Sequence, residues 1–270
     1  DPTKLKTSGG PITQDNTSVE YYCTIFSADE SPLKEGLLWV GSDDGLIHIT
    51  QDGGVNWKNV TPKQMPEWTM INSIEPSPFD PGTCYVAGTR YKSGDYTPYL
   101  YKTTDYGATW KTITNGIAKE DFTRVVRADP SREGMLYTGT ENGIYISYDD
   151  GSSWAVFQKN LPIVPITDLK IKDNSLIVAT QGRSIWILDD LTVLHQIQSK
   201  KVSKQTILYK PKQSYRIKGG GGKSSLTAGT NLPNGVIVHY FLKKFNSEKD
   251  KIELQFKSID GKIIKKYSSS

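Results

Sequence analysis

The segment Ser147-Tyr-Asp149-Asp-Gly151-Ser-Ser-Trp154 has two close copies earlier in the chain, at residues 50–57 and 103–110. All three copies fit the pattern Ser/Thr-x-Asp-x-Gly-x-x-Trp, and their aspartates are spaced 53 and 44 residues apart. A four-stranded blade of a β-propeller has about this length. Three copies at this spacing therefore predict repeated β-hairpins and a propeller architecture.

Each fixed position of this motif has a structural role. The aspartate carboxylate can accept hydrogen bonds from backbone N–H groups of its own turn. The glycine permits a positive φ where the chain reverses, and the tryptophan buries a large ring beneath the hairpin. We therefore interpret the motif residues as structural rather than catalytic. They are Asp52, Gly54, Trp57, Asp105, Gly107, Trp110, Asp149, Gly151 and Trp154.

A second repeated hairpin precedes the motif. Residues 38–49 and 136–147 place alternating apolar residues around Asp-Gly and Asn-Gly turns, and residues 177–187 form a fourth copy that no motif follows. Turns of this kind join antiparallel strands, and no segment has sustained helical periodicity. We therefore expect an all-β chain whose first part is a partial β-propeller of four-stranded blades.

The blade boundaries follow from the repeat. A connecting segment is expected at residues 1–19 and about 3.5 blades at residues 20–195. The blades are placed at 20–62, 68–115, 122–158 and 165–191, the last without its outer strand. Propellers usually close with about four to eight blades, which removes exposed sheet edges. We therefore interpret the chain as a fragment and expect the missing propeller blades from a longer chain or a second chain.

The repeat ends before the C-terminal part. Residues 196–235, with the run Gly219–Gly222, are predicted to be a linker, and residues 236–270 an incomplete Ig-like β-sandwich. Residues 200–270 contain sixteen Lys and Arg against four Asp and Glu. This imbalance is typical either of contact with a polyanion or membrane surface or of a lysine-rich solubilising surface. We favour the solubilising surface.

Several classes of function have no support in the sequence. No stretch approaches the roughly 18 apolar residues of a transmembrane helix, and no aromatic and basic residues interleave as in nucleic-acid-binding proteins. No zinc-ligand spacing, phosphate loop or nucleophile elbow is present, so no metal and no cofactor is expected. Cys23 and Cys84 are interpreted as buried free thiols, with one bridge as the alternative. His48 and His239 are interpreted as structural, and His195 stands apart from them.

The motif copies, the turn Ser42-Asp-Asp-Gly45 and the segments 9–16, 182–191 and 231–235 resemble bacterial sortilin-like proteins. The propellers of those proteins carry Asp-box, or neuraminidase-type (BNR), repeats, and the proteins are often labelled glycosyl hydrolases. The resemblance implies an extracytoplasmic protein, whether secreted, periplasmic or on the cell surface. It also implies further propeller upstream of this region.

The resemblance does not establish hydrolysis, because Asp-box repeats occur in sialidases, xyloglucan-cleaving enzymes and sortilin-type receptors alike. Most glycosidases use two carboxylates about 5–9.5 Å apart, and no local motif selects such a pair among the 29 acidic residues. The catalytic residues are therefore unknown. We expect a binding or interaction platform for protein, peptide or glycan. The alternatives are a glycoside hydrolase with catalytic acids partly outside this chain, and a structural subunit of an envelope assembly.

Blade topology identifies one face as the candidate ligand face. Turns between second and third strands share this face with the connections between blades, and the motif lies on the opposite face. The insertion at residues 90–96 is long, aromatic and charged, as binding loops on rigid scaffolds often are. The candidate residues are Trp68, Arg90, Tyr91, Asp95, Tyr96, Phe122, Arg124, Glu141 and Arg183.

Overall fold

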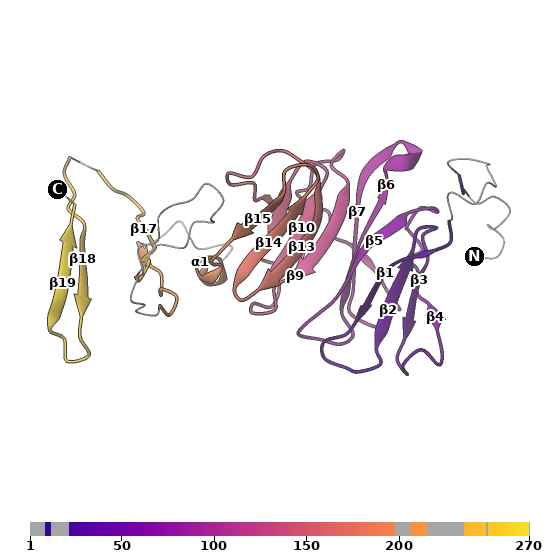
Figure 1. Cartoon of the computed structure of the whole chain (residues 1–270), viewed down its shortest axis with the longest axis horizontal. Coiled ribbons are helices and arrows are strands. Elements are labelled where there is room, and N and C mark those ends of the chain that lie inside the picture. Colours follow the sequence, from indigo (N-terminus) through magenta and orange to yellow (C-terminus); the bar gives the residue numbers. More distant parts are fainter. Residues whose placement is uncertain (1–8, 12–21, 198–205, 215–234, 247, 270) are drawn as a thin grey trace, which may run out of the picture. The chain divides into compact units, whose positions relative to one another are not determined.

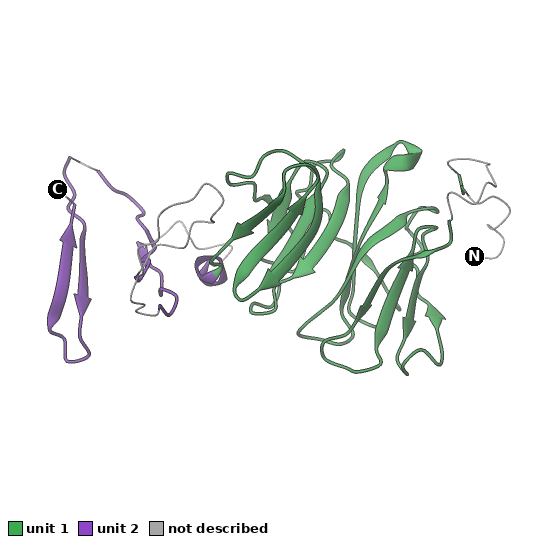
Figure 2. Ribbon diagram, viewed as in Figure 1, with its two compact units in different colours: residues 1–191 green, residues 192–270 purple. Residues whose placement is uncertain are grey.

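The computed structural model describes residues 9–11, 22–197, 206–214, 235–246 and 248–269. Two compact units divide the chain at Leu191, as Figure 2 shows: residues 1–191 and residues 192–270. Most of the predicted connecting segment and much of the predicted linker, including Gly219–Gly222, lie outside the described residues.

Unit 1 consists of four antiparallel sheets in chain order (Figure 1). The first sheet contains β1 (Ile25–Glu30), β2 (Leu38–Ser42), β3 (Ile47–Thr50) and β4 (Lys58–Asn59). The second contains β5 (Met70–Pro76), β6 (Cys84–Arg90), β7 (Asp95–Thr103) and β8 (Lys111–Thr112). The third contains β9 (Thr123–Ala128), β10 (Leu136–Thr140), β11 (Ile144–Ser147) and β12 (Ala155–Val156). The fourth has three strands, β13 (Ile166–Lys172), β14 (Ser175–Thr180) and β15 (Ile185–Leu188).

The sheets follow one another as blades of a propeller. Each is a meander in which neighbouring strands along the chain pair, so the first strand lies at one edge and the last at the other. The first strands also lie side by side between sheets, because β5 contacts both β1 and β9, and β9 contacts β13. The chain is therefore an all-β protein with a partial β-propeller of four-stranded blades.

Tight turns and apolar alternation produce these sheets. Gly45 in the β2–β3 turn has φ 90°, a left-handed conformation that glycine adopts without strain. In the strands, apolar residues of one sheet face a neighbouring sheet. Trp39 and Ile47 of the first sheet share a buried cluster with Val86 and Tyr101 of the second. The core of unit 1 thus lies between the sheets.

A second cluster joins the second and third sheets. Leu100 of β7 lies in it with Leu136, Tyr145 and Trp154 of the third sheet. Burial of such apolar side chains is the main stabilising contribution to a stack of sheets.

The described residues of unit 2 form one short helix, α1 (Thr192–Gln196), and two strand pairs. β16 (Ile207–Leu208) pairs with β17 (Tyr240–Phe241), and β18 (Glu253–Lys257) pairs with β19 (Ile263–Ser268). β16 lies within the range predicted as a linker. It forms a strand there because its backbone hydrogen-bonds to β17, which is distant in the sequence. The Ig-like β-sandwich stays a prediction. No helix among the described residues has the length and apolar character needed to cross a bilayer.

Candidate functional site

The three motif turns (residues 50–57, 103–110 and 147–154) close on themselves through their aspartates. Asp149 Oδ1 accepts hydrogen bonds from the Ser153 backbone N–H at 2.8 Å and from the Ser147 hydroxyl at 2.9 Å. Asp149 Oδ2 accepts from the Ser153 hydroxyl at 2.6 Å. Equivalent bonds surround Asp52 and Asp105. Both oxygens of each carboxylate are therefore engaged within the turn.

These hydrogen bonds also set the charge state of the motif. Bonds from the backbone and side chain of Asn56, and then from Thr50, lower the pKa of Asp52 to about 2. Bonds from Thr109 likewise lower the pKa of Asp105. A general acid needs a raised pKa so that it is protonated at working pH. These two aspartates have the opposite character, which suits a structural brace.

Two of the motif tryptophans join neighbouring sheets. Trp110 Nε1 donates to the Val60 carbonyl at 2.7 Å, and Trp154 Nε1 donates to the Ile113 carbonyl at 2.6 Å. Val60 directly follows β4 and Ile113 directly follows β8, the last strands of the preceding sheets. Trp57 in the first sheet is 45% exposed. The motif thus stabilises the joint between blades as well as its own hairpin, which the sequence alone did not indicate.

The insertion at residues 90–96 is a hairpin extension rather than a long loop. The ladder of β6 and β7 continues to the pair Arg90–Asp95, leaving a single 3-10 turn at Tyr91–Ser93. Arg90 and Tyr99 each donate to Asp95 Oδ2 at 2.7 Å. These bonds hold the tip in regular structure. Strands β6 and β7 therefore extend into the segment that was expected to be a long insertion.

An aromatic cluster (Tyr91, Tyr96, Phe122 and Arg124) lies beside this hairpin. The Tyr91 ring stacks on Phe122 with centroids 5.1 Å apart and planes inclined by 14°, and the Tyr96 ring centroid lies 6.0 Å from Phe122. The Arg124 guanidinium lies 5.0 Å from the Phe122 centroid, and its nitrogens bind Glu141 Oε2 at 2.6 and 2.8 Å. Phe122 is 3% exposed and Tyr96 52%, so Tyr96 is the most accessible ring of the cluster.

The remaining two candidates differ in position. Trp68 lines a small hollow with Tyr22 and Arg90, and its ring meets Tyr22 edge-on at 5.5 Å. Arg183 lies in the β14–β15 turn, where its guanidinium donates to the Gly182 carbonyl at 3.2 Å. Among the contacts of the described residues, none joins Arg183 to the aromatic cluster. The structure therefore brings together eight of the nine candidate residues around the tip of the β6–β7 hairpin and leaves Arg183 apart.

Both acidic residues among the candidates lie in ion pairs. The carboxylates of Asp95 and Glu141 are each paired with an arginine. Burial alone would raise the pKa of Asp95, but hydrogen bonds from Tyr99, Thr97 and Arg90 together lower it. Within the described part of the chain, no group of three or more His, Cys, Asp or Glu side chains could hold a metal ion.

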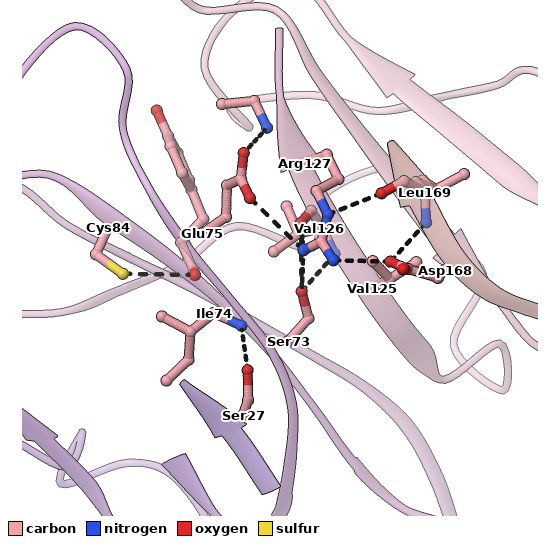
Figure 3. A network of polar contacts seen from close by, with 12 residues as sticks. Ser27, Ser73, Ile74, Glu75, Cys84, Val125, Val126, Arg127, Asp168 and Leu169 are labelled. Carbon is pink, nitrogen blue, oxygen red and sulfur yellow. Dashed lines mark hydrogen bonds and ion pairs between the residues drawn. The ribbon is translucent and has the colours of Figure 1, made fainter. Parts of the chain in front are cut away.

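A polar network that the sequence did not indicate ties the inner strands together (Figure 3). Arg127 of β9 donates from Nη1 to the Ser73 hydroxyl and from Nη2 to Asp168 of β13, both at 2.7 Å. Its Nε donates to the Leu169 carbonyl at 2.8 Å. Glu75 of β5 lies 3.6 Å from Arg127, and burial raises the pKa of this carboxyl to about 7. Arg127 and these partners belong to three sheets, so no local sequence pattern marks them.

Both cysteines are free thiols, as expected, but only Cys84 is buried. Cys23 is partly exposed because it precedes β1, whose residues are mostly exposed. His48 lies on β3, and burial lowers its pKa. His239 precedes β17 and accepts a backbone hydrogen bond from Tyr209. His195 lies in α1.

Repeated four-stranded sheets that pack face to face, with their first strands side by side, define the class of this chain, a β-propeller protein. The model of the Sortilin-Vps10 family, described as "Sortilin, neurotensin receptor 3", matches residues 45–184. This match covers more than half of the chain, which therefore belongs to the Sortilin-Vps10 family. No curated protein matches the chain.

Similar solved structures are also propellers of other proteins. "YCF48 bound to D1 peptide" is 20% identical with a TM-score of 0.48, over 62% of this chain and 51% of that one. The GH74 xyloglucanase from Xanthomonas campestris is 12% identical with a TM-score of 0.49, over 61% of this chain and 29% of that one. This chain thus spans about half of the first structure and less than a third of the second.

Proposed function

We propose that this chain is part of an extracytoplasmic sortilin-like propeller that acts as a binding platform for a protein or peptide. The ligand would bind the aromatic cluster at the tip of the β6–β7 hairpin. The observation that carries the proposal is an exposed Tyr96 beside a stacked Tyr91–Phe122 pair.

The rigidity of the site supports a binding role. The Tyr91 ring contacts both Phe122 and the Arg124 guanidinium, and Arg124 is paired with Glu141. A contact surface that is already ordered loses little conformational entropy when a ligand binds. Tyrosine and arginine are also the residue types that most often dominate the binding energy of protein interfaces.

A binding role also suits the acidic residues better than hydrolysis. A glycosidase needs one carboxylic acid with a raised pKa facing its substrate. The pKa of Asp95 beside the aromatic cluster is shifted downward. Burial raises the pKa of Asp43 in the hollow of Trp68 and Arg90, but Asp43 Oδ1 already accepts the Thr24 backbone N–H at 2.9 Å. The raised pKa of Glu75 belongs to a residue buried between sheets. Glycoside hydrolysis therefore stays the alternative, with catalytic acids partly outside this chain.

The family is consistent with this proposal, since its model is described by the name of a receptor. We place the protein outside the cytoplasm for the same reason. Glycan remains a second ligand class for an aromatic surface of this kind. Further blades outside these 270 residues would complete the ring, because four sheets in a row leave two sheets with one open face each.

The test is selection of a phage-displayed random peptide library on the purified protein. Selected peptides are expected to lose at least about tenfold in affinity for Tyr96→Ala, the range of an interface hot spot. The control is Phe79→Ala, which removes an exposed ring (40% exposed) from the β5–β6 turn at the opposite face.

Equal loss with both variants, or peptides that bind Tyr96→Ala as well as the unaltered protein, would contradict the proposal. Release of reducing sugar from xyloglucan or a sialoside by the unaltered protein would favour the hydrolase instead.

A further inference from the structure

The first strand of each sheet, the inner strand, contains a β-bulge near its start. In all four sheets the pairing of this strand with the second strand skips one residue. The skipped residues are Phe26 in β1, Asn72 in β5, Arg124 in β9 and Thr167 in β13. A bulge gives up ladder hydrogen bonds and re-aims a side chain, and bulges are frequent next to active sites. Because Arg124 belongs to the aromatic cluster, its counterparts in the other sheets point to a wider site on the ligand face.

Packing holds these bulges in place. Ile71 and Ile166, which directly precede the bulges of β5 and β13, are fully buried. Each lies on a glycine of the preceding sheet, since a Cβ at Gly41 would come within 2.3 Å of Ile71 and one at Gly139 within 2.6 Å of Ile166. Ser73, which follows the bulge of β5, accepts a backbone N–H of β9 at 3.3 Å (Figure 3). The bulged residues therefore extend from an anchored backbone.

In the second and third sheets, the bulged residue bonds a side chain at the end of the second strand. Asn72 Oδ1 accepts a hydrogen bond from the Thr89 hydroxyl at 3.0 Å. Arg124 pairs with Glu141 at 2.6 Å. Among the described residues, the NH2 group of Asn72 makes no hydrogen bond, so it can donate to a ligand.

The fourth sheet has the same two positions without a bond between them. Its bulged residue is Thr167, and its partner position is Gln181. The Gln181 N–H donates to the Pro165 carbonyl at 2.9 Å, just as the Glu141 N–H donates to the Phe122 carbonyl at 3.2 Å. The side chains of Thr167 and Gln181 are exposed, and neither makes a hydrogen bond within the described part of the chain. This sheet thus presents a hydroxyl and an amide to solvent.

Neighbouring inner strands bring these positions into one row. β9 contacts β5 on one side and β13 on the other, so Asn72 and Thr167 lie on the strands that flank the strand of Arg124. The Arg124 guanidinium lies 5.3 Å from the Tyr91 ring centroid. The bulge row (Asn72, Arg124, Thr167 and Gln181) therefore continues the aromatic cluster toward the fourth sheet.

We propose that the bulge row binds the main chain of an extended peptide, one of whose apolar side chains contacts Tyr96. An amide side chain offers a donor and an acceptor, so Gln181 can pair with both the N–H and the C=O of one peptide residue. The carboxylate beside the row, that of Glu141, is paired with Arg124, which leaves amide and hydroxyl groups for the ligand. Main-chain bonds give affinity for many sequences, and side-chain contacts such as that of Tyr96 give selectivity. This inference rests on the proposed function and adds the residues that hold the ligand.

The peptides selected on the purified protein also test the bulge row. Thr167→Val and Gln181→Ala are each expected to weaken Tyr96-dependent peptides about three- to tenfold, the range of one neutral hydrogen bond. Thr112→Val is the matched control, because it removes an exposed hydroxyl from the outer strand β8. The urea midpoint of all three variants is expected to stay unchanged, since the altered side chains are exposed.

Ester substitution in the peptide identifies the main-chain contact. An ester in place of one backbone amide removes its N–H and changes the shape little. One such ester is expected to weaken binding to the unaltered protein and to have no further effect on Gln181→Ala, in which the acceptor is already missing.

The outcomes distinguish this inference from the proposed function. If Tyr96-dependent peptides bind Thr167→Val and Gln181→Ala as tightly as Thr112→Val, the bulge row is refuted and the proposed function stands. If no selected peptide depends on Tyr96, both are refuted. Binding of a glycan that both variants weaken, in the absence of any such peptide, would overturn the peptide assignment of the row.

Discussion

The carboxyl group of Glu75 shows how a single buried residue links folding to pH. It lies beside Arg127 and accepts the Ala128 backbone N–H at 3.1 Å (Figure 3). Burial nevertheless raises its pKa to about 7, above that of a glutamate in an unfolded chain. The folded protein therefore binds a proton that the unfolded chain releases between the two pKa values. This favours the folded state at low pH, and the advantage is lost as pH rises from about 4.5 to about 7.

The variant Glu75→Gln is expected to remove this pH dependence. The glutamine keeps an oxygen for the Ala128 N–H and has no charge to desolvate. Relative to the unaltered protein, Glu75→Gln should gain on the order of 3 kcal/mol of unfolding free energy between pH 5 and pH 8. Urea unfolding at the two pH values measures this gain. An unchanged difference between the two proteins at both pH values would show that Glu75 titrates normally.

The three motif turns were the part of this fold that the sequence predicted best. The hydrogen bonds that the aspartates accept within these turns span at most four residues, as from Ser153 to Asp149. A local pattern of eight residues therefore contained the whole turn, and its spacing contained the blade. Glu75 meets Ala128 across 53 residues, and its site carries no comparable pattern.

The candidate site could be predicted only in part from the sequence. Strand order placed most of the candidate residues on one face, because antiparallel turns alternate between faces. It could not show that Tyr91 stacks on Phe122, since that contact joins two sheets through side-chain packing. It also could not show that Arg183 stands apart.

The motif glycines provide a prediction about the joints between elements. Gly107 and Gly54 occupy the same motif position, with φ of 80° and 93°. Alanine at either position incurs the left-handed backbone penalty of about 1–2 kcal/mol. At Gly107 the new Cβ also meets Val60 at 2.6 Å, which adds about 1–3 kcal/mol of overpacking.

In the 270-residue chain, Gly107→Ala should therefore lower the free energy of unfolding by about 1–3 kcal/mol more than Gly54→Ala does. Denaturant unfolding of the two variants gives this difference directly. If both variants lose the same stability, a Cβ at position 107 does not clash with Val60.

Within unit 1 as a whole, the Arg127 side chain makes polar contacts that connect three sheets. It holds Ser73 and Glu75 of β5 on one side and Asp168 and Leu169 of β13 on the other. Arg127→Met would leave the Glu75 carboxyl buried without its cation and would remove two hydrogen bonds between the third and fourth sheets. Breaking a buried pair by removing one partner typically destabilises by about 3–5 kcal/mol.

Two measurements separate these effects. Adding Glu75→Gln to Arg127→Met should recover part of the lost unfolding free energy at pH 8, because the double variant has no uncompensated charge. Amide hydrogen exchange should rise most in β13–β15, which lose two hydrogen bonds to Arg127, and least in β1–β4. A uniform rise across all four sheets would mean that unit 1 opens as one cooperative body. Arg127 would then stabilise the whole stack rather than the attachment of its last blade.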